Sequence, residues 1–320
     1  MRTVRSVTVL CAALALAFAS QAGASSQPVT SSQPVRTGVA DLRAPIGGTV
    51  QDTRSGADAR RAAGPAAAAF RDLRQRGGPR DSATRPAGSQ KSVAAEQIHN
   101  FWGILPPNEG AGDGMSATHA VFPDLKISQD GDFLYAPTSK PGAGGCVEVV
   151  TSYSSYYGPQ IWAWDWCGSG NLEKQVNVDS TFTATYTTTV NGHLSYSVRN
   201  VQTNAASNAW TAYLFNYRTN TWDAFFSSSG QDQSASTYGW DVFEIYSSVN
   251  PSTGQGYYCT ASVGKTFESN DIKLRKNGSW VPASPADSPF VPDQPNAADY
   301  QCPALNFQVA NADDHWLVSH

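Results

Sequence analysis

Residues 146–167, CVEVVTSYSSYYGPQIWAWDWC, decide the fold of this 320-residue chain. Two runs rich in β-branched and aromatic residues flank a Tyr-Gly-Pro turn, with a cysteine at each outer end. Such runs on either side of a turn predict a β-hairpin. Because side chains alternate between the faces of a strand, Trp162, Trp164 and Trp166 share one face. With Glu148 in the first run, the hairpin predicts a groove lined by three indoles and one carboxylate.

The rest of the downstream chain repeats this pattern. Short runs of alternating apolar and polar residues are separated by clusters of Gly, Asn, Ser and Pro, and no ten-residue stretch carries a helical stripe. About ten such strands predict an all-β domain over residues 95–320, an antiparallel β-sandwich or jelly roll (concanavalin-like). The predicted strands are 133–136, 147–153, 160–166, 175–186, 193–201, 209–217, 222–227, 239–246, 257–263 and 265–274, with a last one within 305–318.

The first 24 residues have the pattern of a secretory signal peptide. Arg2 and Arg5 precede an apolar run over 7–19, and the small residues 22–24 follow as a cleavage site. The apolar run is too short to span a bilayer, and we find no other candidate membrane segment. The sequence therefore predicts a secreted, extracellular protein with no membrane partner.

Residues 25–94 have a different composition from the rest. They are rich in Ala, Gly, Ser, Pro and Arg, and Phe70 is their one aromatic residue. We expect this segment to be disordered apart from a short helix over 63–76. Residues 25–91 carry a net charge of +6, and the chain beyond them carries −12. The segment is therefore either a linker or a basic pro-segment that docks on the acidic domain. Arg60-Arg61 and Arg74-Gln75-Arg76 are candidate processing sites within it. The negative charge of the downstream domain argues against a nucleic-acid partner.

The cysteines indicate an oxidising compartment. Once Cys11 leaves with the signal peptide, four remain, which favours two disulfides. Proximity in sequence favours Cys146 with Cys167 and Cys259 with Cys302, although four cysteines allow three pairings. No C-x-x-C or H-x-x-x-H spacing is present, so we predict no metal and no cofactor.

A second strand carries a carboxylate among apolar residues. In residues 240–246, WDVFEIY, Trp240, Glu244 and Tyr246 share one face, while Phe243 enters the core from the other. Glu244 then either faces solvent, pairs with an arginine such as Arg199 or Arg218, or has a function.

Glu148 raises the same question, because it too lies in an apolar run. If Glu148 and Glu244 face each other across one sheet, they form a carboxylate pair in which one member acts as base towards water and the other as acid. Such a pair suits hydrolysis of a peptide or glycosidic bond.

These residues resemble the glutamic peptidases (eqolisin and neprosin branches). The resemblance lies in the strand that carries Glu148, in the hairpin that leads into Ala163-Trp164-Asp165-Trp166, and in the later Trp240-Asp241-Val242-Phe243-Glu244. It implies a β-sandwich endopeptidase that acts in acid, with a basic propeptide and a Glu148/Glu244 catalytic pair. Trp240 lies one residue further from Glu244 than the eqolisin pattern has it, and the cysteine-rich neprosin signature is absent.

Three functions follow from these observations. The first is a secreted acid endopeptidase in which Glu244 activates water and Glu148 assists, with a polypeptide as substrate. Its substrate-binding residues are Trp162, Trp164, Trp166, Trp240 and Tyr246. The second is a non-catalytic carbohydrate-binding domain that stacks polysaccharide on exposed indoles, including Trp210 and Trp222. The third is a jelly-roll glycosidase that uses the same glutamates.

Overall fold

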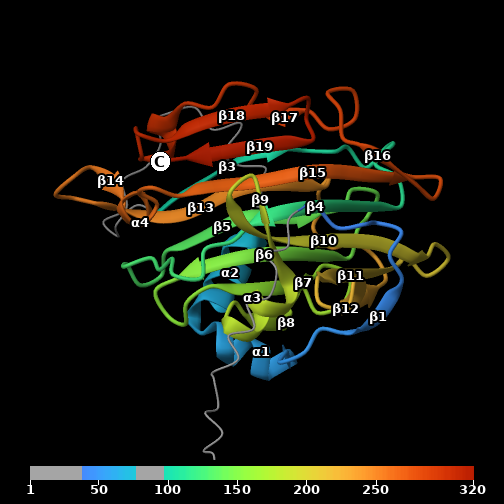
Figure 1. Cartoon of the computed structure of the whole chain (residues 1–320). Helices are drawn as coiled ribbons and strands as arrows, with labels where there is room; N and C mark the ends of the chain where they lie inside the picture. Colours follow the sequence, from blue (N-terminus) through green and yellow to red (C-terminus); the bar gives the residue numbers. More distant parts are fainter. Residues whose placement is uncertain (1–37, 77–96) are drawn as a thin grey trace, which may run out of the picture. The chain divides into compact units, whose positions relative to one another are not determined.

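The computed structural model of the chain describes residues 38–76 and 97–320 (Figure 1). Two large, mainly antiparallel sheets build this part of the chain, which confirms the predicted all-β sandwich. The predicted signal peptide lies outside the described residues, as do 25–37 and 77–94 of the expected disordered segment. Within the described residues, no helix is long and apolar enough to cross a membrane.

The nine-stranded sheet contains the hairpin quoted above as two neighbouring strands, β6 and β7. Its strands follow the order β17-β3-β13-β5-β6-β7-β8-β2, and β14 pairs with β13. Their bounds are β2 Arg54–Ser55, β3 Gln97–Ile104, β5 Phe133–Lys140, β6 Val147–Ser154, β7 Gln160–Asp165, β8 Asn171–Asn177, β13 Trp240–Asn250, β14 Gln255–Gly256 and β17 Phe290–Val291.

The ten-stranded sheet forms the second layer of the sandwich. Its order is β1-β12-β11-β10-β4-β15-β19-β18, with β16 paired to β15 and β9 to β10. Their bounds are β1 Ile46–Thr49, β4 Gly114–Ala120, β9 Thr187–Val190, β10 His193–Asn204, β11 Ala209–Asn216, β12 Thr221–Ser229, β15 Thr266–Lys276, β16 Ser279–Pro282, β18 Asn306–Asn311 and β19 His315–Ser319.

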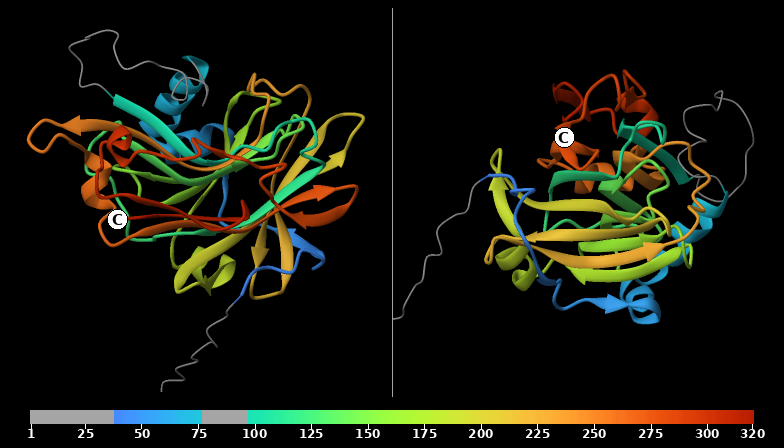
Figure 2. Two further views of the ribbon diagram at one scale, coloured as in Figure 1. Left: turned by 90° about the horizontal axis from the view of Figure 1, so that it is seen from above. Right: turned by 90° about the vertical axis from the view of Figure 1, so that its right-hand side faces the viewer.

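Figure 2 shows the ribbons of the two sheets from two further sides. Two apolar clusters fill the space between the sheets. One joins Phe243 of β13 to Phe267 of β15. The other joins Val149 of β6 to Val198 of β10. Each cluster takes its members from alternate positions of both sheets, so the opposite face of each strand points away from this core. The face of β13 that carries Glu244 is therefore an outer face of the sandwich.

The upstream segment is ordered over residues 38–76, so the expectation of disorder is wrong there. It adds β1 to one sheet in parallel with β12 and β2 to the other sheet beside β8. Two helices follow, α1 (Gly56–Ala63) and α2 (Pro65–Arg76), of which α2 lies where the short helix was predicted. The segment, coloured blue in Figure 1, is ordered because it packs on the sandwich and not because it has a core of its own.

Two predicted strands are partly helical. The stretch 175–186 divides into the end of β8 and α3 (Ser180–Tyr186). Asp179 caps that helix by accepting hydrogen bonds from the backbone N–H groups of Thr181 and Phe182, which outweighs the strand preference of the threonines. The predicted strand 257–263 is instead α4 (Tyr257–Ala261), which directly follows β14. The stretch 305–318 forms two strands, β18 and β19, instead of one.

Both disulfides join the cysteines that proximity favoured. Cys146 and Cys167 close the hairpin with a Cα–Cα distance of 5.0 Å. Cys259 of α4 is joined to Cys302, which follows the 3₁₀ helix η1 (Ala297–Tyr300), with a Cα–Cα distance of 5.4 Å. The second disulfide thus fixes the proline-rich stretch before Cys302 against the sandwich.

Candidate functional site

The outer face of the nine-stranded sheet carries a third apolar cluster, which we call the outer aromatic cluster. Its members come from β3, β5, β6, β7, β8 and β13 of the sheet, or from residues next to these strands, and from helices α1 and α2. Alternation along the strands puts both candidate glutamates on this face. The cluster consists of Ala59, Ala63, Ala66, Ala67, Phe70, Phe101, Leu105, Phe133, Tyr135, Val150, Trp162, Trp164, Trp166, Leu172, Trp240, Val242 and Tyr246.

Glu148 is fully buried on this face, and the described part of the chain supplies three hydrogen-bond donors to it. The hydroxyl of Thr138 donates to Oε1 at 2.6 Å, and the indole Nε1 of Trp240 donates to the same oxygen at 3.0 Å. The indole Nε1 of Trp166 donates to Oε2 at 3.0 Å. Both carboxylate oxygens of Glu148 therefore accept hydrogen bonds from side chains of the sheet and of Trp166, which directly follows β7. Two of the predicted substrate-binding tryptophans thus hold a glutamate.

Glu244 is equally buried, and among the described residues two other side chains bind it. The hydroxyl of Tyr246 donates to Oε1 at 2.8 Å, and Nε2 of His99 lies 2.8 Å from the same oxygen. The His99 ring stacks on the Tyr246 ring, with centroids 4.1 Å apart and planes 6° from parallel. Arg199, one predicted partner of Glu244, instead donates to the Leu42 carbonyl from the other sheet.

The two glutamates lie on one face but not at one level. Glu244 pairs with Tyr135 of β5, and Tyr135 pairs in turn with Ser152 of β6. Ser152 follows Glu148 by four residues, which is about 13 Å along a strand. The strand β5 also separates β13 from β6. The expected face-to-face pair is therefore replaced by two carboxylates set diagonally across β5.

The side chain of Phe70, from α2, enters the space between these two positions. It is fully buried, and its ring lies 4.6 Å from the rings of both Tyr135 and Trp164. The rings of Tyr246 and Trp162 lie 6.1 Å and 6.4 Å away. All four contacts are edge-to-face, the arrangement that aromatic quadrupoles favour. A residue of the upstream segment thus occupies the predicted groove.

The predicted indole platform does not form. Trp162, Trp164 and Trp166 share a face as expected, but they are 1%, 1% and 7% exposed. Trp210 belongs to the core between the sheets, and Trp222 belongs to a separate cluster on the other sheet. The prediction of one exposed surface of five tryptophans for stacking sugars is therefore wrong.

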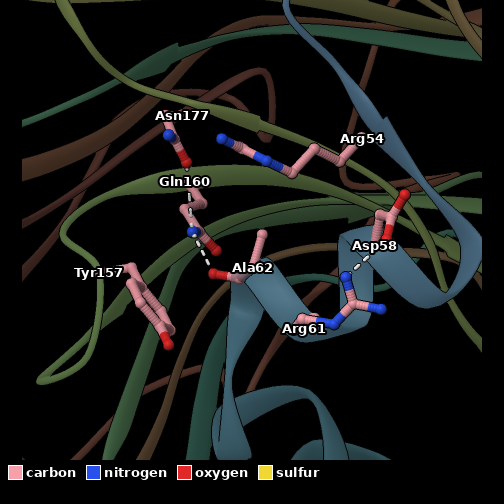
Figure 3. A pocket seen from close by; sticks show the side chains of 7 residues that line it. All are labelled: Arg54, Asp58, Arg61, Ala62, Tyr157, Gln160 and Asn177. Carbon is pink, nitrogen blue, oxygen red and sulfur yellow. Dashed lines mark hydrogen bonds and ion pairs between the residues drawn. The ribbon is translucent and has the colours of Figure 1, made fainter.

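A polar cavity of about 410 Å³ lies beside the site, where α1 meets β7 and β8 (Figure 3). Its lining side chain Gln160 donates from Nε2 to the Ala62 carbonyl at 2.9 Å and accepts from Trp162 Nε1 at 2.8 Å. This link fixes α1 to the outer aromatic cluster. The lining contains neither glutamate, so the cavity belongs to the contact between helix and sheet; it is formed by Arg54, Asp58, Arg61, Ala62, Tyr157, Gln160 and Asn177.

A third buried carboxylate lies next to β5. Burial raises the pKa of Asp132, although Ser247 and Ser248 at the end of β13 donate hydrogen bonds to it. Asp132 thus ties the start of β5 to β13, the strand of Glu244, and it holds a proton more readily than an exposed aspartate.

One group of potential metal ligands occurs among the described residues. Nε2 of His320 lies 3.8 Å from Sγ of Cys259, close to Cys302. Both sulfurs belong to a disulfide and therefore offer no thiolate for a metal.

Sequence reasoning missed three residues of the site: His99, Thr138 and Phe70. His99 lies in a run of mainly apolar residues, 97–105, most of which forms β3 in the structure. It reaches Glu244 because β3 pairs with β13, and a single sequence does not reveal that pairing. Thr138 has no distinguishing pattern. Phe70 did carry a signal, because an isolated aromatic residue in a segment without a core must find its apolar partners elsewhere.

No family model and no curated protein matches the sequence. Solved structures similar to this chain are glutamic peptidases, the family that the sequence resembles. One is scytalido-glutamic peptidase with a peptide-based transition-state analogue, at 14% identity and a TM-score of 0.38. Another is SCP-B of the eqolisin family with the tripeptide Ala-Ile-His, at 15% identity and a TM-score of 0.38. Each match covers 70% of this chain and 100% of the other chain. This likeness is remote, and the function proposed below rests on the chain's own residues.

Proposed function

We propose that this protein is a secreted endopeptidase that acts in acid and is kept latent by its own upstream segment. One observation carries the proposal. Two fully buried glutamates share the outer face of one sheet, and the aromatic cluster between them is filled by Phe70 of α2. Burying carboxylates in an aromatic surface is expensive, so a structural role alone is a poor explanation of two such residues.

Glu244 is the general base in this proposal. It removes a proton from the water that attacks the peptide carbonyl, and the bonds from His99 and Tyr246 fix its orientation. Glu148 supplies the proton that the leaving amine takes up. The four-residue offset keeps the two carboxylates apart, so they do not share a proton.

The segment over 38–76 accounts for latency. Its helix α2 covers the face that a substrate must reach, and basic residues are frequent in it while the sandwich is acidic. Acid neutralises carboxylates of the sandwich and weakens this attraction, which favours release. The two disulfides are compatible with the extracellular location that this role requires.

The test is digestion of a denatured protein by the full chain after acidification, across pH 3 to 7. The variants Glu244→Gln and Glu148→Gln keep the size of each side chain, and Glu109→Gln at an exposed position is the matched control. We expect the Glu244 variant to lose activity by at least about 100-fold and the control to keep it. A wild-type chain that is inactive at every pH, or an active Glu244→Gln chain, would refute the proposal.

The Glu148 variant assigns the second role. If Glu148 donates the proton to the leaving group, Glu148→Gln is inactive although it unfolds like the wild type. If the variant cleaves at the wild-type rate, Glu148 only positions Trp166 and Trp240, and the assignment as acid is wrong.

A further inference from the structure

The four aromatic rings around Phe70 form a defined pocket, which we call the Phe70 socket: Tyr135, Trp162, Trp164 and Tyr246. We propose that this socket is the main specificity subsite of the enzyme and binds a phenylalanine or a similarly large apolar side chain of a polypeptide substrate. The inference rests on the proposed function and adds the class of substrate to it.

The position of the socket is the first argument. On one side, the Tyr246 wall donates its hydroxyl to Glu244 at 2.8 Å. On the other side, the Trp164 ring lies 6.1 Å from the Trp166 ring, whose Nε1 donates to Glu148. A side chain seated in the socket therefore places its own backbone between the two carboxylates, where the proposed reaction takes place.

The shape of the socket is the second argument. Phe70 is fully buried and meets the edges or faces of all four rings. Hydrogen bonds fix two of the walls: Trp162 donates to Gln160 at 2.8 Å, and Tyr246 donates to Glu244 at 2.8 Å. An aromatic ring buries more surface in such a space than a methyl group does, and a charged side chain would lose its hydration there.

An unused donor is the third argument. Trp164 is 1% exposed, and its indole Nε1 has no acceptor among the described residues. A buried donor without an acceptor is unfavourable, and the phenyl ring of Phe70 supplies none. A peptide brings a backbone carbonyl next to each side chain, so the Trp164 N–H finds its acceptor when substrate replaces Phe70.

The binding test does not require catalysis. In the full chain, Phe70→Ala empties the socket, and N-acetyl-phenylalaninamide is then added as a probe. We expect the probe to raise Tm by about 2 °C or more, while N-acetyl-alaninamide does not. The matched control is Phe182→Ala, which opens a cavity between the sheets, and it should gain no comparable stability. If Phe70→Ala fails to fold, Phe70→Leu is used, because it loosens the socket with a smaller change of volume.

The inference would be overturned if the two probes raised the Tm of Phe70→Ala equally. It would also be overturned if N-acetyl-phenylalaninamide raised the Tm of Phe70→Ala and Phe182→Ala by the same amount. Both results leave the proposed function intact if the acidified wild type still digests denatured protein.

The kinetic test uses peptides that differ at one residue beside the scissile bond. We expect kcat/KM for phenylalanine to exceed that for alanine by about 30-fold and that for lysine by more. Trp164→Phe should lower kcat/KM for all of these peptides by about tenfold, because it removes the N–H that binds the peptide carbonyl. Equal rates for phenylalanine and alanine would show a peptidase that does not use this subsite.

Discussion

The indole of Trp240 and the carboxylate of Glu148 form a hydrogen bond across an intervening strand. The two residues lie on β13 and β6, which are separated by β5, yet Nε1 reaches Oε1 at 3.0 Å. This bond links the strand that carries Glu244 to the strand that carries the other glutamate. Any force that shifts one of these strands therefore also moves the donors of Glu148.

Replacing Trp240 by Phe keeps a large ring and removes this donor. We expect the free energy of unfolding to fall by about 1.5 to 3 kcal/mol, because the carboxylate of Glu148 stays buried with one donor fewer. Urea unfolding measures the loss. The control is Trp280→Phe at a half-buried position, which should change stability by less than about 1 kcal/mol. Equal effects of the two substitutions would contradict the assignment of this bond.

His99 is the site residue that most directly tests the role of Glu244. We expect His99→Ala to lower kcat by about 10- to 100-fold, because it removes the bond between His99 Nε2 and Glu244 Oε1. The bond from the Tyr246 hydroxyl to the same oxygen would remain. Tyr246→Phe removes the other bond while keeping the ring, and it should have a similar effect. Peptide hydrolysis under single-turnover conditions checks this, and an unchanged rate in both variants would mean that neither bond matters for catalysis.

The two disulfides should differ in their effects on stability and activity. Cys146 and Cys167 are 21 residues apart, and loop-closure entropy predicts that replacing both by Ser lowers the free energy of unfolding by about 3 kcal/mol. Cys259 and Cys302 are 43 residues apart, and their replacement should lower it by about 4 kcal/mol. The first pair adjoins Trp166, a donor to Glu148, so its loss should also reduce activity at temperatures where the chain stays folded. Unfolding and hydrolysis of each double variant check this, and the opposite order of activities would refute it.

Asp313 should make the protein more stable in mild acid. Burial, together with the carboxylates of Asp287, Asp314 and Asp293, raises the pKa of Asp313 from the usual aspartate value of 3.8 to about 6. The folded state therefore binds this proton more tightly, and the resulting stability is complete below pH 4 and is lost as the pH rises through 6. Asp313→Asn should abolish about 1 kcal/mol of the difference in stability between pH 4 and pH 7, whereas Asp52→Asn at an exposed position should not. An unchanged difference in the Asp313 variant would contradict the shift.

The sequence predicted what strand alternation and local spacing determine. It placed Trp162, Trp164 and Trp166 on one face, because that pattern depends only on the period of a strand. It also found both disulfides, since each joins cysteines that are neighbours in the chain.

The sequence did not predict what pairing between distant strands determines. The level of Glu148 relative to Glu244 depends on two strand registers across β5, which no local pattern encodes. The order in residues 38–76 was missed for a related reason. That segment lacks a core of its own, and its structure depends on the sandwich on which Phe70 is buried.

The helix that carries Phe70 is connected to the sandwich at both of its ends. On one side, α1, β2 and β1 join it to the edges of the two sheets, and on the other side the next described element of the chain is β3. A single proteolytic cut therefore leaves the helix tethered, and its effective concentration at the site stays far above what free diffusion gives. Full activation should need two cuts, so the progress curve of activation should begin with a lag.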